Sequence, residues 1–277
     1  MSKANLGGKA LHFQSFPSMT AKAVLKQGAA SADQVAVRVS MSQQAKPGNG
    51  AAMRGGASRA PGNGTADDLL AAAALFLMTV AAGKSRLCGV ALSQEMTVAI
   101  AAARAFGATI ETAPDGFIVS GLGTGVLLEP ALPINVTGAP LTAALLIGLV
   151  SSHDVPVTLV GEGLEVLATP FLPIGLQMKD EGDGRVLLCG SKTPPPARWR
   201  VGAGDSVETL AILLSALNTP GLTVIDLEDA SSFLSLFQSF GAGFEMKGGE
   251  QGKFTLAMIG RRPLAAASFD ISALAAD

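Results

Sequence analysis

The chain has 277 residues, of which 48% are hydrophobic and only 5% are aromatic, and its formal net charge is −2. This composition is sufficient for a sizeable core, and it requires that Ala, Leu, Val and Gly fill most of the interior. Two cysteines exclude a disulfide framework and a cysteine-rich metal site. The longest apolar run, residues 69–82, is too short to span a membrane.

Charge is unevenly distributed along the chain. Residues 1–66 contain eight Lys or Arg and a single acid, Asp33, which leaves twelve basic and 21 acidic residues for the rest. Residues 1–58 are therefore predicted to form a basic, mostly irregular arm, with at most a short strand at 34–39. A solvated disordered segment, a docking or anion-binding arm and an organelle transit segment all fit this composition. Without interleaved aromatic residues, the arm indicates no specific recognition of nucleic acid.

Three stretches of the remaining chain repeat one order of elements with a step of about 67 residues. Each begins with an apolar, Ala- and Leu-rich helix. A short strand-like run follows, then a second helix that ends at a glycine, and then two short strands around a polar turn. The first helices are predicted at 67–82, 138–150 and 205–217, the following runs at 85–90, 155–161 and 221–226, and the second helices at 101–107, 167–175 and 233–241.

A fixed period of this kind is typical of stacked copies of one supersecondary unit, none of which can bury its apolar face alone. The short connections agree, because Asp115-Gly116 and Asp183-Gly184 are typical of tight turns between adjacent strands. We therefore predict an α/β fold of three like repeats around a pseudo-threefold axis, with helices inside and sheets outside. The expected repeats are about 59–130, 131–197 and 198–277.

Residue types that often bind metals or perform catalysis have structural interpretations at most positions. Asp67 and Asp68 open a helix, where acids stabilise the first turn. His153 lies in a predicted polar turn, without a nearby cysteine or second histidine that would complete a site. Cys88 and Cys189 are expected to be small buried hydrophobes in a reducing compartment.

The third repeat contains two further groups of side chains with structural interpretations. Residues 226–229 include three acids and are expected to form a solvated turn, which could receive a basic partner. Phe233, Phe237 and Phe240 recur at helical spacing and are expected to lie in the core.

Several motifs together resemble those of one enzyme family. Pro61-Gly62-Asn63-Gly64-Thr65 precedes an apolar helix, Lys192-Thr193-Pro194-Pro195-Pro196 precedes Arg200-Val201, and Leu217-Asn218-Thr219-Pro220-Gly221 ends the third repeat's first helix. These motifs resemble 5-enolpyruvylshikimate-3-phosphate (EPSP) synthase, most closely its glyphosate-tolerant bacterial class. The resemblance covers residues 59–272, which is all of the body and none of the arm.

The resemblance implies a fold and the position of a site. EPSP synthases have two lobes, each built from three copies of the repeat, and their site lies between the lobes. This chain resembles one lobe only. The expected fold is therefore one lobe of an inside-out α/β barrel, made of three βαβαββ-type repeats.

The resemblance also indicates where two anionic substrates, phosphoenolpyruvate and shikimate-3-phosphate, would meet Lys and Arg side chains. The family's cationic positions fall on Gly64, Leu69, Ala144 and Glu208 in this sequence. Positive charge is thus replaced by small, apolar or acidic residues. Vestigial substrate-binding positions remain at Asn63, Thr65 and Ser206. We predict no catalytic residue, no cofactor and no metal ligand.

We therefore expect a noncatalytic EPSP-synthase-like protein, a pseudoenzyme that acts as a structural or interaction subunit of a larger assembly. Its partner would be another protein or a second copy of the chain, bound through the open lobe face and the basic arm. An active or split 3-phosphoshikimate 1-carboxyvinyltransferase is the alternative, and a module for a less anionic small molecule is a third. We expect a cytoplasmic location, or an organelle matrix if residues 1–58 are a transit segment.

Overall fold

The computed structural model describes residues 36–38, 65–202, 204, 206–228, 233–248 and 253–274. The chain divides into two units, Met1–Asp33 and Gln34–Asp277, and all described residues belong to the second. Most of the predicted arm therefore lies outside the described residues. Strand β1 (Ala36–Arg38) falls within the run for which a short strand was expected. No helix in the described part of the chain is long and apolar enough to cross a bilayer.

Three copies of one plan make up this second unit, as the spacing predicts. The first copy contains α1 (Ala66–Thr79), β2 (Ala82–Cys88), α2 (Gln94–Ala105), β3 (Thr109–Ala113) and β4 (Gly116–Leu122). The second contains β5 (Ile134–Asn135), α3 (Pro140–Ser151), β6 (Pro156–Val160), α4 (Leu164–Ala168), the 3-10 helix η1 (Thr169–Ile174), β7 (Gln177–Gly182) and β8 (Arg185–Cys189). The third contains β9 (Arg198–Val201), α5 (Ser206–Asn218), β10 (Leu222–Leu227), α6 (Leu234–Ser239), β11 (Gly243–Gly248) and β12 (Phe254–Ile259), and is followed by β13 (Ser268–Asp270) and α7 (Ile271–Leu274).

The three sheets share one pairing scheme. In the order β5-β6-β8-β7 the first pair is parallel and the others are antiparallel, and β9-β10-β12-β11 repeats this scheme. The first copy forms the order β13-β2-β4-β3, in which β13 comes from the far end of the chain and runs parallel to β2. The C-terminal segment thus completes the first repeat. Strand β1 extends the third sheet by pairing in parallel with β9.

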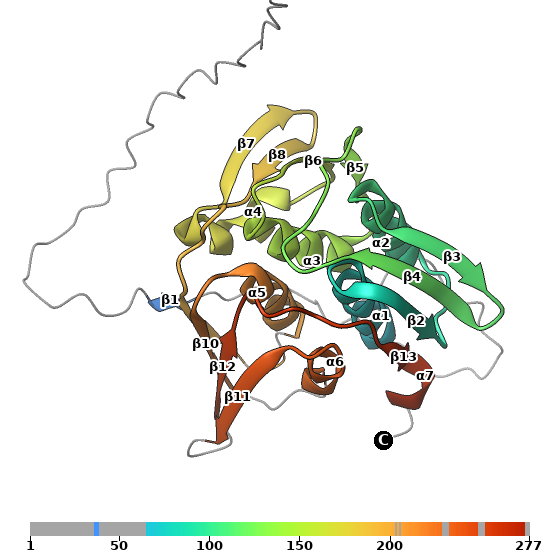
Figure 1. Ribbon diagram of the computed structural model, residues 1–277. Coiled ribbons are helices and arrows are strands. Elements are labelled where there is room, and N and C mark those ends of the chain that lie inside the picture. Colours follow the sequence, from blue (N-terminus) through green and yellow to red (C-terminus); the bar gives the residue numbers. More distant parts are fainter. Residues whose placement is uncertain are drawn as a thin grey trace, which may run out of the picture. The chain divides into compact units, whose positions relative to one another are not determined.

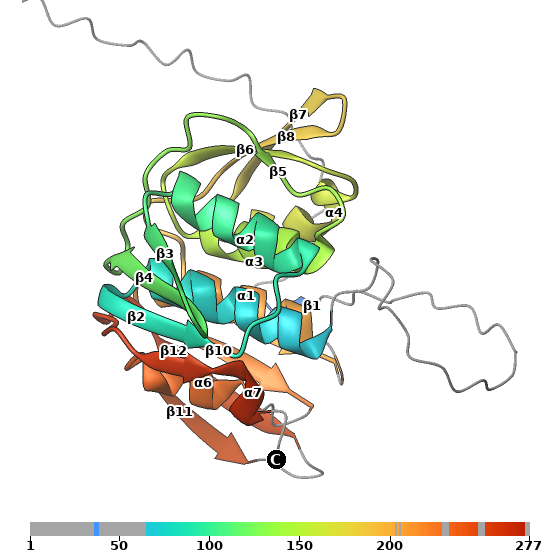
Figure 2. The same ribbon diagram turned by 90° about the vertical axis from the view of Figure 1, so that its right-hand side faces the viewer.

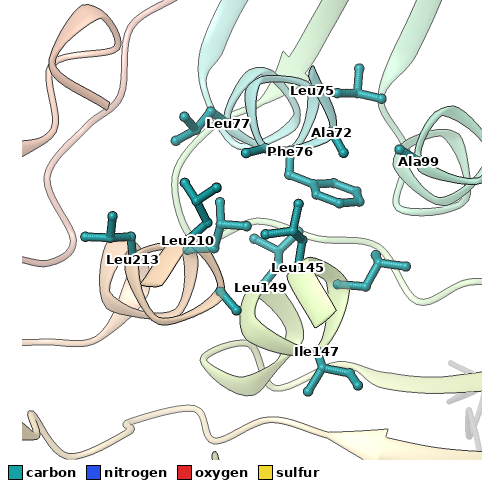
Figure 3. Close-up of a cluster of buried hydrophobic side chains, with 14 of the residues drawn as sticks. Ala72, Leu75, Phe76, Leu77, Ala99, Leu145, Ile147, Leu149, Leu210 and Leu213 are labelled. Carbon is teal, nitrogen blue, oxygen red and sulfur yellow. The ribbon is translucent and has the colours of Figure 1, made fainter. Parts of the chain in front are cut away.

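The core lies between the first helices of the three copies, α1, α3 and α5, and the sheets cover them from outside (Figure 1). Helix α3 is buried over nearly its whole length, so it has no polar face. Phe76, Leu145, Leu149 and Leu210 point into the space between the three helices (Figure 3). Around them, α2 packs beside α1 and α3 (Figure 2).

The inner helices run parallel, and their C-terminal ends meet. Ser151 at the end of α3 donates a hydrogen bond to Ser215 near the end of α5 at 2.8 Å, and Asn218 Nδ2 donates to the Ser152 carbonyl at 2.5 Å. At the end of α1, the Thr124 hydroxyl donates to the Val80 carbonyl at 3.5 Å. We call the end of the bundle at which these three helices begin the amino end. We call the end at which they finish the carboxyl end.

Two sets of glycines mark the repeats. Gly107, Gly175 and Gly241 follow the second helices with φ values of 105°, 99° and 81°, which suits the left-handed residue that ends a helix. This set was predicted. A second set was not: Gly121, Gly190 and Gly260 lie at or just after the last strand of each copy.

At this second set, backbone of the inner helix ends leaves no space for a side chain. A Cβ added at Gly121, Gly190 or Gly260 would lie 2.1, 2.0 or 1.9 Å from a carbonyl oxygen of Met78, Val150 or Thr219, respectively. The missing side chain is therefore what lets each last strand contact the end of its inner helix.

Several local expectations are confirmed. Asp183 and Gly184 have φ values of 52° and 68°, as a two-residue hairpin turn with two left-handed residues requires. Phe233, Phe237 and Phe240 are buried in the core.

Other expectations were wrong. Helix α2 begins at Gln94 rather than at residue 101, because the Ser93 hydroxyl caps it by accepting from the Met96 amide at 3.2 Å. Cys88 and Cys189 are half-buried rather than buried, since each ends a strand beside an aspartate. Burial raises the pKa of both thiols.

Asp226 is not part of a solvated turn. It lies in β10, where its carboxylate accepts hydrogen bonds from Arg198 at 2.8 and 3.0 Å and from Thr255 at 3.0 Å. The Arg198 contact holds the pKa of the Asp226 carboxyl below its usual range. The sequence pattern did not indicate this ion pair, because its partners come from neighbouring strands 28 and 29 residues away.

His153 lies in the turn that follows α3, as expected, but it is buried. Its side chain follows the end of α3, and only 3% of the residue is exposed. Since a carbonyl oxygen only accepts, His153 Nδ1 carries the proton that it donates to Leu149 O at 2.7 Å. Burial lowers the pKa of the imidazole from 6.5 to about 4, so that the ring is neutral at pH 7.

We predict that Gly190→Ala lowers the free energy of unfolding by about 3 kcal/mol, because the new methyl group overlaps the Val150 carbonyl. Urea unfolding followed by circular dichroism measures the change. Gly248→Ala is the matched control, since a Cβ at Gly248 has no neighbour within 4 Å among the residues that the structure describes. Equal unfolding midpoints for the two variants would contradict this packing.

We also predict that the His153 ring makes stability depend on pH. The pKa of the ring is lower in the folded state than in the unfolded state. The contribution of the neutral ring to the stability of the fold is therefore fully present above about pH 6.5 and is lost as pH falls towards 4. The loss amounts to about 3 kcal/mol. The free energy of unfolding, measured at intervals between pH 7 and pH 4, should decrease more steeply for the parent than for His153→Gln. Parallel pH profiles would refute the assignment.

Candidate functional site

Those singled-out positions that the structure describes lie at the amino end of the bundle. Thr65 is the N-cap of α1, and Ser206 is the first residue of α5. Leu69 and Ala144, which take family arginine positions, are buried in α1 and α3. Asn63 lies outside the described residues.

A helix N-terminus favours anions for two reasons. Its first N–H groups have no partner within the helix, and the aligned peptide dipoles place partial positive charge there. Three parallel helices that begin at one end of a bundle therefore form a favourable place for a phosphate or a carboxylate. Which groups already occupy these helix ends decides what the site can do.

The end of α1 is occupied by its own first turn. Thr65 and Asp68 form a reciprocal capping box: the Thr65 amide donates to Asp68 Oδ2 at 2.8 Å, and the Asp68 amide donates to Thr65 Oγ1 at 3.2 Å. Asp67 beside them is exposed. The prediction that Asp67 and Asp68 have a capping role is confirmed for Asp68.

A carboxylate from another helix occupies the end of α3. Glu95, in the first turn of α2, is only 4% exposed, and its two oxygens accept from the amides of Leu141 at 3.1 Å and Thr142 at 2.8 Å. The Thr142 hydroxyl donates to the Glu95 carbonyl at 3.0 Å. Glu95 thus takes the place that a bound anion would take at this helix end.

Sequence reasoning missed Glu95. Its contact with α3 joins residues 46 and 47 positions apart, and no local pattern indicates it. The start of α3 carried a weak signal, because Pro140 opens the helix while Ala139 offers no capping side chain. A helix without its own cap requires a partner from elsewhere.

The end of α5 carries a buried acid in its first turn. Glu208 takes the position at which the resemblance places a lysine, and it is 2% exposed. Ser206 is half-buried, and its amide donates to the Gly204 carbonyl at 2.9 Å. Ser206 therefore lies in the same first turn as a buried acidic residue.

Each inner helix thus begins beside at least one carboxylate of the same chain. The described first turns of α1, α3 and α5 contain no Lys or Arg. Two like charges about 4 Å apart repel each other by about 4 kcal/mol at the effective dielectric of a protein surface. The described first turns of the inner helices therefore bring acidic and no basic side chains to the amino end of the bundle.

Comparisons with known proteins agree with the architecture. No protein-family model matches the chain. It is 28% identical over 202 residues to the 3-phosphoshikimate 1-carboxyvinyltransferase of Brucella canis, which covers 69% of this chain and 45% of that protein. It is also 28% identical over 226 residues to the enzyme of the same name from Rhizobium johnstonii, covering 78% of this chain and 49% of the relative. The chain spans about half the length of the curated relatives it matches.

Solved structures give the same result for the fold. The EPSP synthase of Acinetobacter baumannii superposes with a TM-score of 0.62 at 19% identity, over 73% of this chain and 47% of the enzyme. The chain is therefore similar in sequence to 3-phosphoshikimate 1-carboxyvinyltransferases, also called EPSP synthases, and it has the fold of one lobe of such an enzyme.

Proposed function

We propose that this chain is a noncatalytic, cytoplasmic EPSP-synthase-like protein that acts as a structural or interaction subunit of a larger assembly. The observation that carries the proposal is the set of carboxylates, Asp68, Glu95 and Glu208, at the three inner helix ends. The scaffold that presents these ends is intact. Its charge has the wrong sign for the reaction named in the relatives.

The substrate named in the relatives explains why the sign matters. A phosphate ester carries about −1.5 to −2 charges at pH 7, and its recognition depends on Lys, Arg or unoccupied backbone N–H groups. The Leu141 and Thr142 amides are already bound to Glu95. A phosphate would therefore have to displace a buried carboxylate and then remain near two others.

Exposed apolar side chains support the role as an interaction subunit. Leu92, just before α2, is 71% exposed, and Val166 in α4 is 68% exposed. Both residues belong to segments near the amino end of the bundle. Helix α2 begins there, because its Glu95 binds the start of α3. Helix α4 follows β6, whose last residue pairs with β5 just before α3 begins. On this proposal, Leu92 and Val166 belong to the surface that contacts another protein or a second copy of the chain. The basic arm, residues 1–58, would then act as a tether.

We predict that the purified full-length chain releases no phosphate from phosphoenolpyruvate and shikimate-3-phosphate in a coupled assay. An EPSP synthase measured in parallel is the positive control. Turnover above the rate of a no-protein blank would support the alternative, a split 3-phosphoshikimate 1-carboxyvinyltransferase, and would overturn the proposal.

We predict that Glu95→Gln allows weak anion binding at the end of α3, because it removes a negative charge while it keeps a side chain of the same size. Shikimate-3-phosphate should then shift the Leu141 and Thr142 amide resonances with an affinity at least about tenfold above that of the parent. Glu111→Gln, on the exposed part of β3, is the control and should leave the parent behaviour unchanged. Indistinguishable titrations of the two variants would argue against electrostatic exclusion by Glu95.

A further inference from the structure

A pocket of about 540 Å³ lies at the carboxyl end of the bundle, opposite the helix ends described above. Three exit segments form it, one from each repeat, together with the ends of α3 and α5. The lining includes Thr124, His153, Asp154, Lys192, Asn218 and Arg261.

The repeat itself explains why a pocket forms here. Thr124, Lys192 and Arg261 each lie two or three residues after the last strand of their copy. The glycines Gly121, Gly190 and Gly260 hold those strands against the ends of the inner helices. The three segments that leave the strands therefore converge around the carboxyl end, and each contributes a polar side chain.

Arg261 is held in place by backbone contacts. Its φ of 58° is unusual for a residue with a side chain, and Nε donates to the Asn218 carbonyl at 3.2 Å while Nη2 donates to the Lys192 carbonyl at 2.6 Å. A guanidinium has five N–H donors, and these two contacts leave others for a ligand. Arg261 thus places a fixed positive charge in the pocket wall.

Lys192 has no comparable structural role. It is exposed, and its ammonium group has no hydrogen bond or ion pair with any residue that the structure describes. The Lys192 backbone is fixed at the edge of the pocket, because its carbonyl accepts from Arg261. Its ammonium group is therefore available to a ligand.

His153 adds a neutral acceptor. Because Nδ1 donates to Leu149, Nε2 carries a lone pair, and this buried atom has no hydrogen-bond partner within the described chain. Buried polar atoms almost always have a partner. His153 lines the pocket, but Nε2 itself is closed to solvent, so a ligand hydroxyl would reach it only after a shift of the surrounding wall.

We propose that this pocket binds a small hydroxylated oxyanion, a carboxylate or phosphate that pairs with Lys192 and Arg261. The lining side chains contain two cations against one acid, Asp154, so their net charge is positive. This charge faces the negative C-terminal ends of the α3 and α5 dipoles, so the two cations must offset these ends before they attract an anion. The side-chain charge of the pocket is opposite in sign to that of the acids at the amino end. The inference does not depend on the proposed function.

The test is an NMR titration of the full-length chain, with inorganic phosphate, glycerol 3-phosphate and glycerate as probes. We expect saturable shifts at the amides of residues 124–127 and 152–155, with glycerol 3-phosphate binding more tightly than phosphate. Comparison of glycerate with glycerol 3-phosphate identifies which oxyanion is preferred. Linear shifts without saturation for all three probes, or shifts centred on Leu141 and Thr142, would overturn the assignment.

Lys192→Met should weaken binding of the preferred probe at least about tenfold, because a charge-assisted contact is lost. Lys179→Met is the matched control: Lys179 is an exposed lysine in β7 and does not line the pocket. The affinity of the Lys179→Met variant for the preferred probe should equal that of the parent. An equal loss in both variants would mean that the anion responds only to overall charge, and the proposed site would be wrong.

Discussion

The contact between Glu95 and the first amides of α3 joins two helices of the core and, on our proposal, decides what can bind at the amino end of the bundle. A buried carboxylate is unfavourable unless its oxygens are hydrogen-bonded, and here two backbone N–H groups and the helix dipole satisfy it. The same contact removes the donors that an anionic ligand would use. One interaction thus stabilises the packing of α2 on α3 and, on our proposal, closes the α3 end to phosphate.

The two ends of the bundle are matched to the helix dipoles. Acidic side chains lie beside the N-terminal ends of the inner helices, and Arg261 donates to a carbonyl at the C-terminal end of α5. This arrangement favours stability because each charge lies beside the opposite end of a dipole. An enzyme that binds phosphate at the N-terminal ends must leave them uncompensated by its own acids. On our proposal, the acids of this chain stabilise the N-terminal ends of its inner helices, and the affinity for an anionic ligand at those ends is lost.

The sequence predicted those parts of the structure that depend on local patterns. Apolar periodicity located the inner helices α1, α3 and α5, and the glycines that end the second helices, such as Gly107, are required by backbone geometry. Contacts between distant residues were not predictable in this way. The Asp226–Arg198 pair, the burial of His153 and the Glu95 contact each depend on elements that meet only after folding. Gly190 looked like an ordinary strand end, because the carbonyl that excludes a side chain belongs to another element.

The most direct measurement is a crystal structure of the full-length chain soaked with shikimate-3-phosphate. The account predicts that both Glu95 oxygens stay on the Leu141 and Thr142 amides and that no ligand density appears at the amino end of the bundle. A phosphate group bound to those amides, with the Glu95 side chain displaced, would contradict the central claim.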